Sequence, residues 1–272
     1  LILILLPISQ VFSQEYTDTN PTLSISLKSQ STFVYQDSEG YTIVIGLIEN
    51  NDPLSFLTNV VIQAKFFDDF NPNSLEVSEG STVLKVIPPN TKSPFIIRSE
   101  NPNPNITEVF TTLLKFDTSE SMKNSLIISN TNIFLDPISN LSDSTYTLYF
   151  SGTLQNGNAP ISETFAYLAF YDVFDRIIQI SSIEIGDVGI NEMKLLKLTE
   201  EISTSAVGFL LFSESDKFYS TILNVKIPPP EIYVKLVSIS DVTVKDTLGK
   251  KLSEVKLGNV VQIESKTSIQ FT

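Results

Sequence analysis

The fold is decided by the stretch Tyr41-Thr-Ile-Val-Ile-Gly-Leu-Ile-Glu-Asn50, which leads to Val60-Val-Ile-Gln-Ala-Lys-Phe-Phe-Asp68. The same pattern returns as Tyr146-Thr-Leu-Tyr-Phe-Ser-Gly-Thr-Leu-Gln-Asn156 and Phe165-Ala-Tyr-Leu-Ala-Phe-Tyr-Asp172. In each copy, apolar residues at a period of two lie between clusters of turn residues, which is typical of short β-strands joined by turns. The repeat at residues 41–69 and 146–175 therefore predicts two copies of one all-β module, a sandwich or a barrel.

The length of 272 residues suits two domains of about 100 to 150 residues with a remainder. We expect β-sandwich domains at residues 20–120 and 121–228. Their last strands are expected to correspond as well, because residues 109–116 and 218–225 are alike in character. Pro228-Pro-Pro230 is a stiff linker, after which residues 229–272 are expected to begin a third, truncated β-domain. Residues 192–198 are expected to form either a strand or a short helical turn.

The amino end reads Leu1-Ile-Leu-Ile-Leu-Leu6, followed by Pro7-Ile-Ser-Gln-Val-Phe-Ser13. A short apolar run before small residues is typical of a signal peptide, so residues 1–14 are predicted to be its remnant, with cleavage near Ser13 or Gln14. The run is too short to span a bilayer. The alternative to a signal peptide is a buried first strand. The chain has no initiator Met and stops inside strand-like sequence, so we expect a fragment of a longer secreted protein.

The composition excludes several classes of function. With 18 basic against 31 acidic residues and a formal charge of −13, the chain lacks the clustered cations that nucleic acids require. It contains neither His nor Cys, which removes Ser-His-Asp and Cys-His catalysis and the usual zinc and copper sites. We therefore expect no cofactor, no nucleic-acid partner and no enzymatic activity.

Acidic and amide residues follow the second strand of each copy. Asp68 and Asp69 precede Asn71 and Asn73 in the first copy, and Asp172 and Asp175 close the second. Clustered oxygen ligands can hold Ca²⁺, which makes these four aspartates weak calcium candidates. The spacing matches no EF-hand, and Asp and Asn also end strands and cap turns without any metal. We favour the turn interpretation and predict no metal site.

Three further patterns in the sequence bear on function. Adjacent carboxylates at Glu200-Glu201 and Asp68-Asp69 could serve acid–base hydrolysis, but neighbours on a strand point to opposite faces. Asn105-Ile-Thr107 and Asn140-Leu-Ser142 are N-glycosylation triplets in predicted loops. A set of strand aromatics could form a carbohydrate or peptide platform, although core packing is the commoner role; these are Phe66, Phe67, Phe165, Tyr167, Phe170 and Tyr171.

The strand pair resembles the FxLYD-type module, an immunoglobulin-like β-sandwich of secreted bacterial and archaeal proteins. The resemblance rests on Gly46 with Asn50 and Ala64-Lys-Phe-Phe-Asp68, and on Gly152 with Asn156 and Leu168-Ala-Phe-Tyr-Asp172. Asp246-x-x-Gly249 and Leu257-Gly-x-x-Val261 are similar to repeats of large archaeal cell-surface proteins. The resemblance implies tandem immunoglobulin-like, extracellular and non-catalytic modules.

These observations predict a secreted or cell-surface structural or interaction protein. Its partners would be other envelope or extracellular proteins, and any membrane anchor would lie outside the fragment. The alternative is a set of accessory binding or spacer domains that belong to a larger extracellular enzyme or transporter complex.

Overall fold

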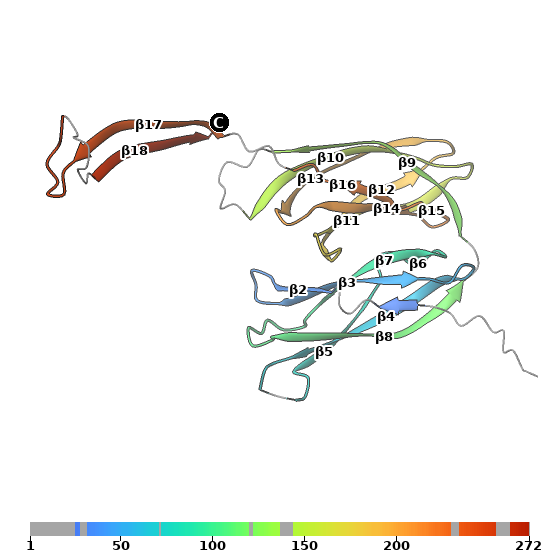
Figure 1. Cartoon of the computed structure of the whole chain (residues 1–272). Helices are drawn as coiled ribbons and strands as arrows, with labels where there is room; N and C mark the ends of the chain where they lie inside the picture. The colour runs from blue at the N-terminus through green and yellow to red at the C-terminus, as the bar shows by residue number, and fades with distance from the viewer. Residues whose placement is uncertain are drawn as a thin grey trace, which may run out of the picture.

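The computed structural model is all-β and contains several sheets (Figure 1), as the alternation of the sequence predicted. It describes residues 25–27, 32–70, 72–119, 122–136, 144–229, 234–253 and 262–271. No helix occurs among these residues. The predicted signal peptide at residues 1–14 lies outside them.

The first unit, residues 25–119, consists of two sheets packed face to face. One sheet contains β1 (Ile25–Leu27), β2 (Phe33–Gln36), β3 (Thr42–Asn50) and β7 (Thr91–Arg98). The other contains β4 (Phe56–Phe67), β5 (Glu76–Ser81), β6 (Val86–Ile87) and β8 (Glu108–Ser119). In the second sheet, β8 pairs with one edge of β4, while β5 and β6 share the other edge. The buried residues between the sheets include Val44 and Ile48 from β3 and Ile62, Ala64 and Phe66 from β4.

The second unit, residues 123–226, is a single eight-stranded sheet that nearly closes on itself. Its strands are β9 (Lys123–Leu135), β10 (Thr145–Gln155), β11 (Ile161–Tyr171), β12 (Ile177–Val188), β13 (Met193–Ser203), β14 (Gly208–Glu214), β15 (Phe218–Ser220) and β16 (Leu223–Lys226). The short β15 joins the two halves of the sheet, because it pairs with β14 and lies parallel to β9. This unit is therefore closer to a barrel than to the two separate sheets that a sandwich predicts.

The repeated stretch occupies matching places in the two units. β3 and β10 are central strands with neighbours on both edges, and so are β4 and β11. The predicted correspondence between the last strands of the two units, residues 109–116 and 218–225, is wrong. Residues 218–225 form two short strands interrupted at Thr221 and Ile222, and the partner of β11 that matches β8 is β14.

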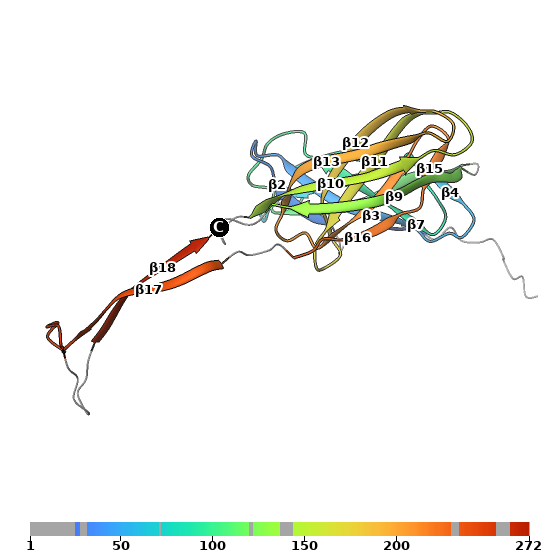
Figure 2. The same ribbon diagram turned by 90° about the horizontal axis from the view of Figure 1, so that it is seen from above.

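A two-stranded sheet follows the second unit. It pairs β17 (Val234–Lys245) with β18 (Gln262–Phe271), and both views show it apart from the larger body (Figures 1 and 2). Residues 192–198, for which a helical turn was one expectation, lie in the strand β13 and the turn before it.

Candidate functional site

Asp172, one of the calcium candidates, serves as the anchor of a hairpin turn. Its Oδ1 accepts hydrogen bonds from the backbone N–H groups of Phe174 and Arg176, and its Oδ2 accepts two more from the Arg176 guanidinium at 2.8 and 2.6 Å. Burial alone would raise the pKa of Asp172, but the hydrogen bonds from Arg176 and Phe174 outweigh it and hold the pKa below its usual value. The carboxylate is thus already satisfied by protein donors.

The other three candidates also lie in turns. Asp175 adopts a positive φ of 59° in the same hairpin. Asp68 accepts the N–H of Phe70, and Asp69 accepts the hydroxyl of Thr107 at 2.7 Å. Among the described residues, no three acidic side chains are grouped so as to hold a metal ion.

The asparagine of the repeat has a structural role that its sequence position did not reveal. Asn50 is the last residue of β3, Asn156 directly follows β10, and both are almost fully buried. The Nδ2 of Asn50 lies within hydrogen-bond distance of the carbonyl oxygens of Ser55, Ile87 and Pro88. The Nδ2 of Asn156 lies within hydrogen-bond distance of the carbonyl oxygens of Ala159, Val188 and Gly189. One amide therefore fastens two loops to the strand end in each unit.

The two units meet at an apolar joint, which we define by the nine buried side chains of one cluster. From the first unit they are Ile43, Ile45, Leu47 and Leu84; from the second, Ala169, Tyr171, Ile177, Leu210 and Phe212. Along β3, alternate residues face the core of the first unit and the joint, which explains why a strand of an ordinary-looking module is apolar on both faces.

A buried carboxylate crosses the joint. Glu214 of β14 is 4% exposed, and its two carboxylate oxygens accept the backbone N–H groups of Lys85 and Val86, each at 2.9 Å. Burial raises the pKa of Glu214, partly offset by these hydrogen bonds. Burial, with a contribution from the charge of Glu214, also raises the pKa of Tyr167 to about 12. Nearby, Lys85 forms an exposed ion pair with Glu163 at 2.7 Å.

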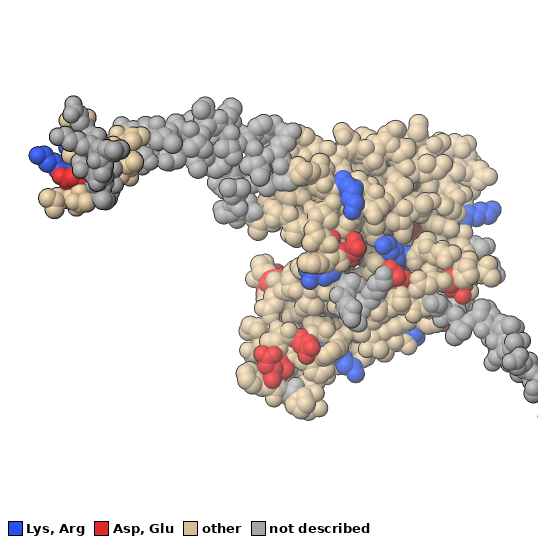
Figure 3. Space-filling model, in the orientation of Figure 1, with Lys and Arg blue, Asp and Glu red and all other residues tan. Residues whose placement is uncertain are grey.

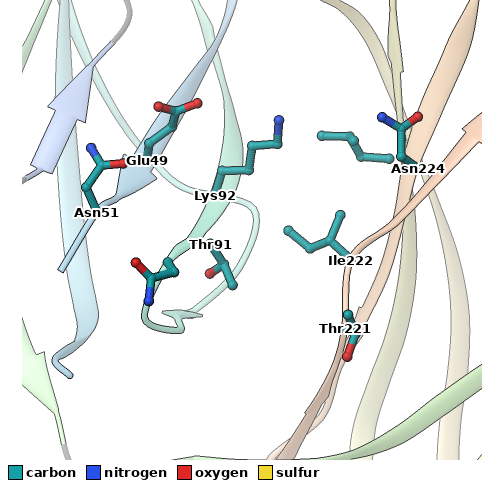
Figure 4. Close-up of a pocket in the computed structure, with 9 residues that line it drawn as sticks. Glu49, Asn51, Thr91, Lys92, Thr221, Ile222 and Asn224 are labelled. Atoms are coloured by element: carbon teal, nitrogen blue, oxygen red, sulfur yellow. The ribbon is translucent and has the colours of Figure 1, made fainter. Parts of the chain in front are cut away.

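A polar groove lies along one side of the joint. It has two lobes of about 470 and 430 Å³ that share Glu49, Lys92, Leu210 and Asn224. Figure 4 shows the Lys92 side chain reaching from the first unit toward Asn224 and Ile222 of the second. Figure 3 shows acidic and basic side chains at the boundary between the two units. Carboxylate, ammonium, amide and hydroxyl groups over an apolar floor can hydrogen-bond a polar ligand.

The remaining sequence candidates are not brought together. Phe66 and Phe170 are fully buried core residues, Phe67 packs edge-on against Phe110 at 5.4 Å, and Phe165 stacks on Tyr167 at 6.1 Å. Glu200 is half-buried and Glu201 is exposed. Asn105 is exposed in a loop, and Asn140 lies outside the described residues. No described segment is a helix of the length and apolarity that a membrane crossing requires.

No protein-family model and no curated protein sequence matches the chain. Among solved structures, it is similar to the crystal structure of red sea bream transglutaminase, at 12% identity and a TM-score of 0.23. That similarity covers 73% of this chain and 31% of the transglutaminase chain.

Proposed function

We propose that this chain is a non-catalytic secreted or cell-surface protein whose two immunoglobulin-like modules act as one rigid spacer or interaction unit. Residues 1–14 and the FxLYD-like strand pair support the extracellular assignment, and the matching strands β3/β10 and β4/β11 support the tandem modules. Its partners are other extracellular or envelope proteins.

The observation that carries the proposal is the joint. Domains linked by a flexible segment move relative to each other unless their interface is large and apolar. Here nine buried apolar side chains meet, and Glu214 satisfies two backbone donors of the opposite unit. These contacts favour a fixed angle between the units, which is the property a spacer needs.

The test measures distances across the joint. The chain contains no Cys, so spin labels can be placed at exposed Lys65→Cys and Lys197→Cys, one on each unit. We expect a single narrow distance distribution by electron paramagnetic resonance. In the Leu84→Asp, Glu214→Ala background the distribution should broaden, because the joint loses apolar packing and the carboxylate.

The control is Glu163→Gln, which breaks only the exposed ion pair with Lys85 and should leave the distribution narrow. Circular dichroism of each variant establishes that both units are still folded. A broad distribution in the unmodified background would show that the units move freely, and the rigid-spacer proposal would then be wrong.

A further inference from the structure

The strand β8 lacks the cover that its counterpart in the second unit has. β14 pairs with β11 on one edge, and β16 and β15 lie along its other edge. β8 is 12 residues long and pairs with β4, with a register shift on either side of the pair Val61 and Lys115, and no other described strand pairs with it. Within the part of the chain that the structure describes, the outer edge of β8 is therefore open (Figure 1).

The middle of this edge carries nothing that would oppose pairing, while the charged residues Glu108, Lys115 and Asp117 lie toward its two ends. Residues 109–114 read Val-Phe-Thr-Thr-Leu-Leu and contain no charge, no Pro and no Gly. Phe110 and Leu114 are 53% and 45% exposed. Proteins normally protect open edges with charges, prolines or covering segments, because a flat uncharged edge recruits another strand. An edge of this composition is suited to being paired.

The apolar side chains beside the edge are also incompletely covered. Val109, Leu113 and Phe116 of β8 pack against the core of the first unit but stay partly exposed, as do Ile25 and Leu27 of β1. In the second unit, Leu223 and Val225 of β16 pack against the core from the position next to β14. A strand added beside β8 would cover the corresponding side of the first unit.

We propose that the occupant is β8 of a second copy of this chain, paired antiparallel about a twofold axis at Thr112. Residues 110–114 of the strand are complementary to a second copy of themselves. An antiparallel pair centred on Thr112 places Thr112 opposite its own copy and Phe110 opposite Leu114 of the second copy, twice. Thr–Thr and apolar cross-strand pairs of this kind stabilise sheets. The same symmetry joins both four-stranded sheets into one continuous sheet.

The pairing is tested with charges at the axis. Thr112 lies exposed on the solvent face, so a substitution there leaves the core intact. In Thr112→Lys or Thr112→Glu, two like charges face each other across the axis and repel. Analytical ultracentrifugation is expected to give a concentration-dependent dimer for the unmodified chain and a dissociation constant at least tenfold higher for each variant. An equimolar mixture of the two variants should regain the dimer.

The matched control is Thr199→Lys, an exposed threonine of β13 that should leave the dimer unchanged. A second readout uses Thr112→Cys in this cysteine-free chain, which should form a disulfide-linked dimer under mild oxidation, whereas Thr199→Cys should not. A chain that stays monomeric at about 100 µM, where a dimer with a dissociation constant on the order of 1 µM would be largely formed, would overturn the proposal. So would a dimer that Thr112→Lys does not weaken.

Discussion

At the scale of single residues, the repeated asparagines do more for the fold than the aspartates that first suggested a site. An amide has two N–H hydrogens, and each of these side chains shares them among three backbone carbonyl oxygens at 2.8–3.2 Å. In the first unit the loops held in this way carry the chain from one sheet to the other, and in the second unit they connect β10 with β11 and β12 with β13. The position of Asn50 and Asn156 at the end of a buried strand is thus explained by the carbonyl groups that gather there.

We predict that Asn156→Ala lowers the free energy of unfolding by about 2 to 4 kcal/mol, because buried carbonyl groups lose their donor. Asn156→Asp should be at least as destabilising, since a carboxylate has the same shape but cannot donate. Urea denaturation measures both. Asn132→Ala, at an exposed position on β9, is the control with little effect, and an equal loss at that position would contradict the assignment.

At the scale of elements, one hairpin turn is used repeatedly. Asp37, Asp172 and Asp246 each accept the backbone N–H groups two and four residues later. Each turn then needs a positive φ three residues after the aspartate, which Gly40, Asp175 and Gly249 supply. Asp175 therefore stands where the other two turns have glycine, and its presence needs no ligand to explain it.

The Asp172 turn makes the stability of the folded chain depend on pH in the acidic range. Because its pKa is held below the ordinary aspartate value, the folded state gains stability above a pH of about 3.9 that is lost as the pH falls through the lowered value. We predict that Asp172→Asn is less stable than the unmodified chain at pH 6 and that the difference shrinks below pH 4. Thermal melts across this range measure it.

Calcium provides a separate test of the four aspartates that were weak calcium candidates. If Asp68, Asp69, Asp172 and Asp175 only close turns, a chelator leaves the melting temperature of the unmodified chain unchanged. A fall in the melting temperature that added Ca²⁺ reverses would establish a metal site instead.

The sequence predicted the elements better than it predicted their partners. Period-two patterns at residues 42–50, 145–155 and 161–171 correctly predicted strands, because each strand has at least one apolar face that packs against a core. The correspondence of residues 109–116 with 218–225 failed because similar composition does not specify which edge a strand pairs with. The near closure of the second unit depends on β15, which pairs over only three residues.

The joint between the two units was also not predicted from the sequence. The second apolar face of β3 faces the other unit. Glu214 looked like an ordinary charged residue, since nothing local marks a carboxylate whose two donors lie 129 and 128 positions earlier in the chain. Contacts between units are set by the final arrangement of faces, so a local pattern does not reveal them.

At the scale of the whole molecule, the two units close their ends differently. In the second unit, β15 near the end of the unit lies parallel to β9 at its beginning, with Phe218 beside Lys123. No parallel pair of this kind is present among the described strands of the first unit.

This difference has a mechanical consequence if the chain is stretched from its two ends. Tension would pull β9 and β15 in opposite directions along their length, so their hydrogen bonds would bear the load together in shear. The first unit would instead lose its edge strands one bond at a time. Single-molecule pulling should therefore record the first unit unfolding at lower force, and the reverse order would contradict it. A chain that connects two points in this way would therefore lengthen in stages, and its second unit would unfold last.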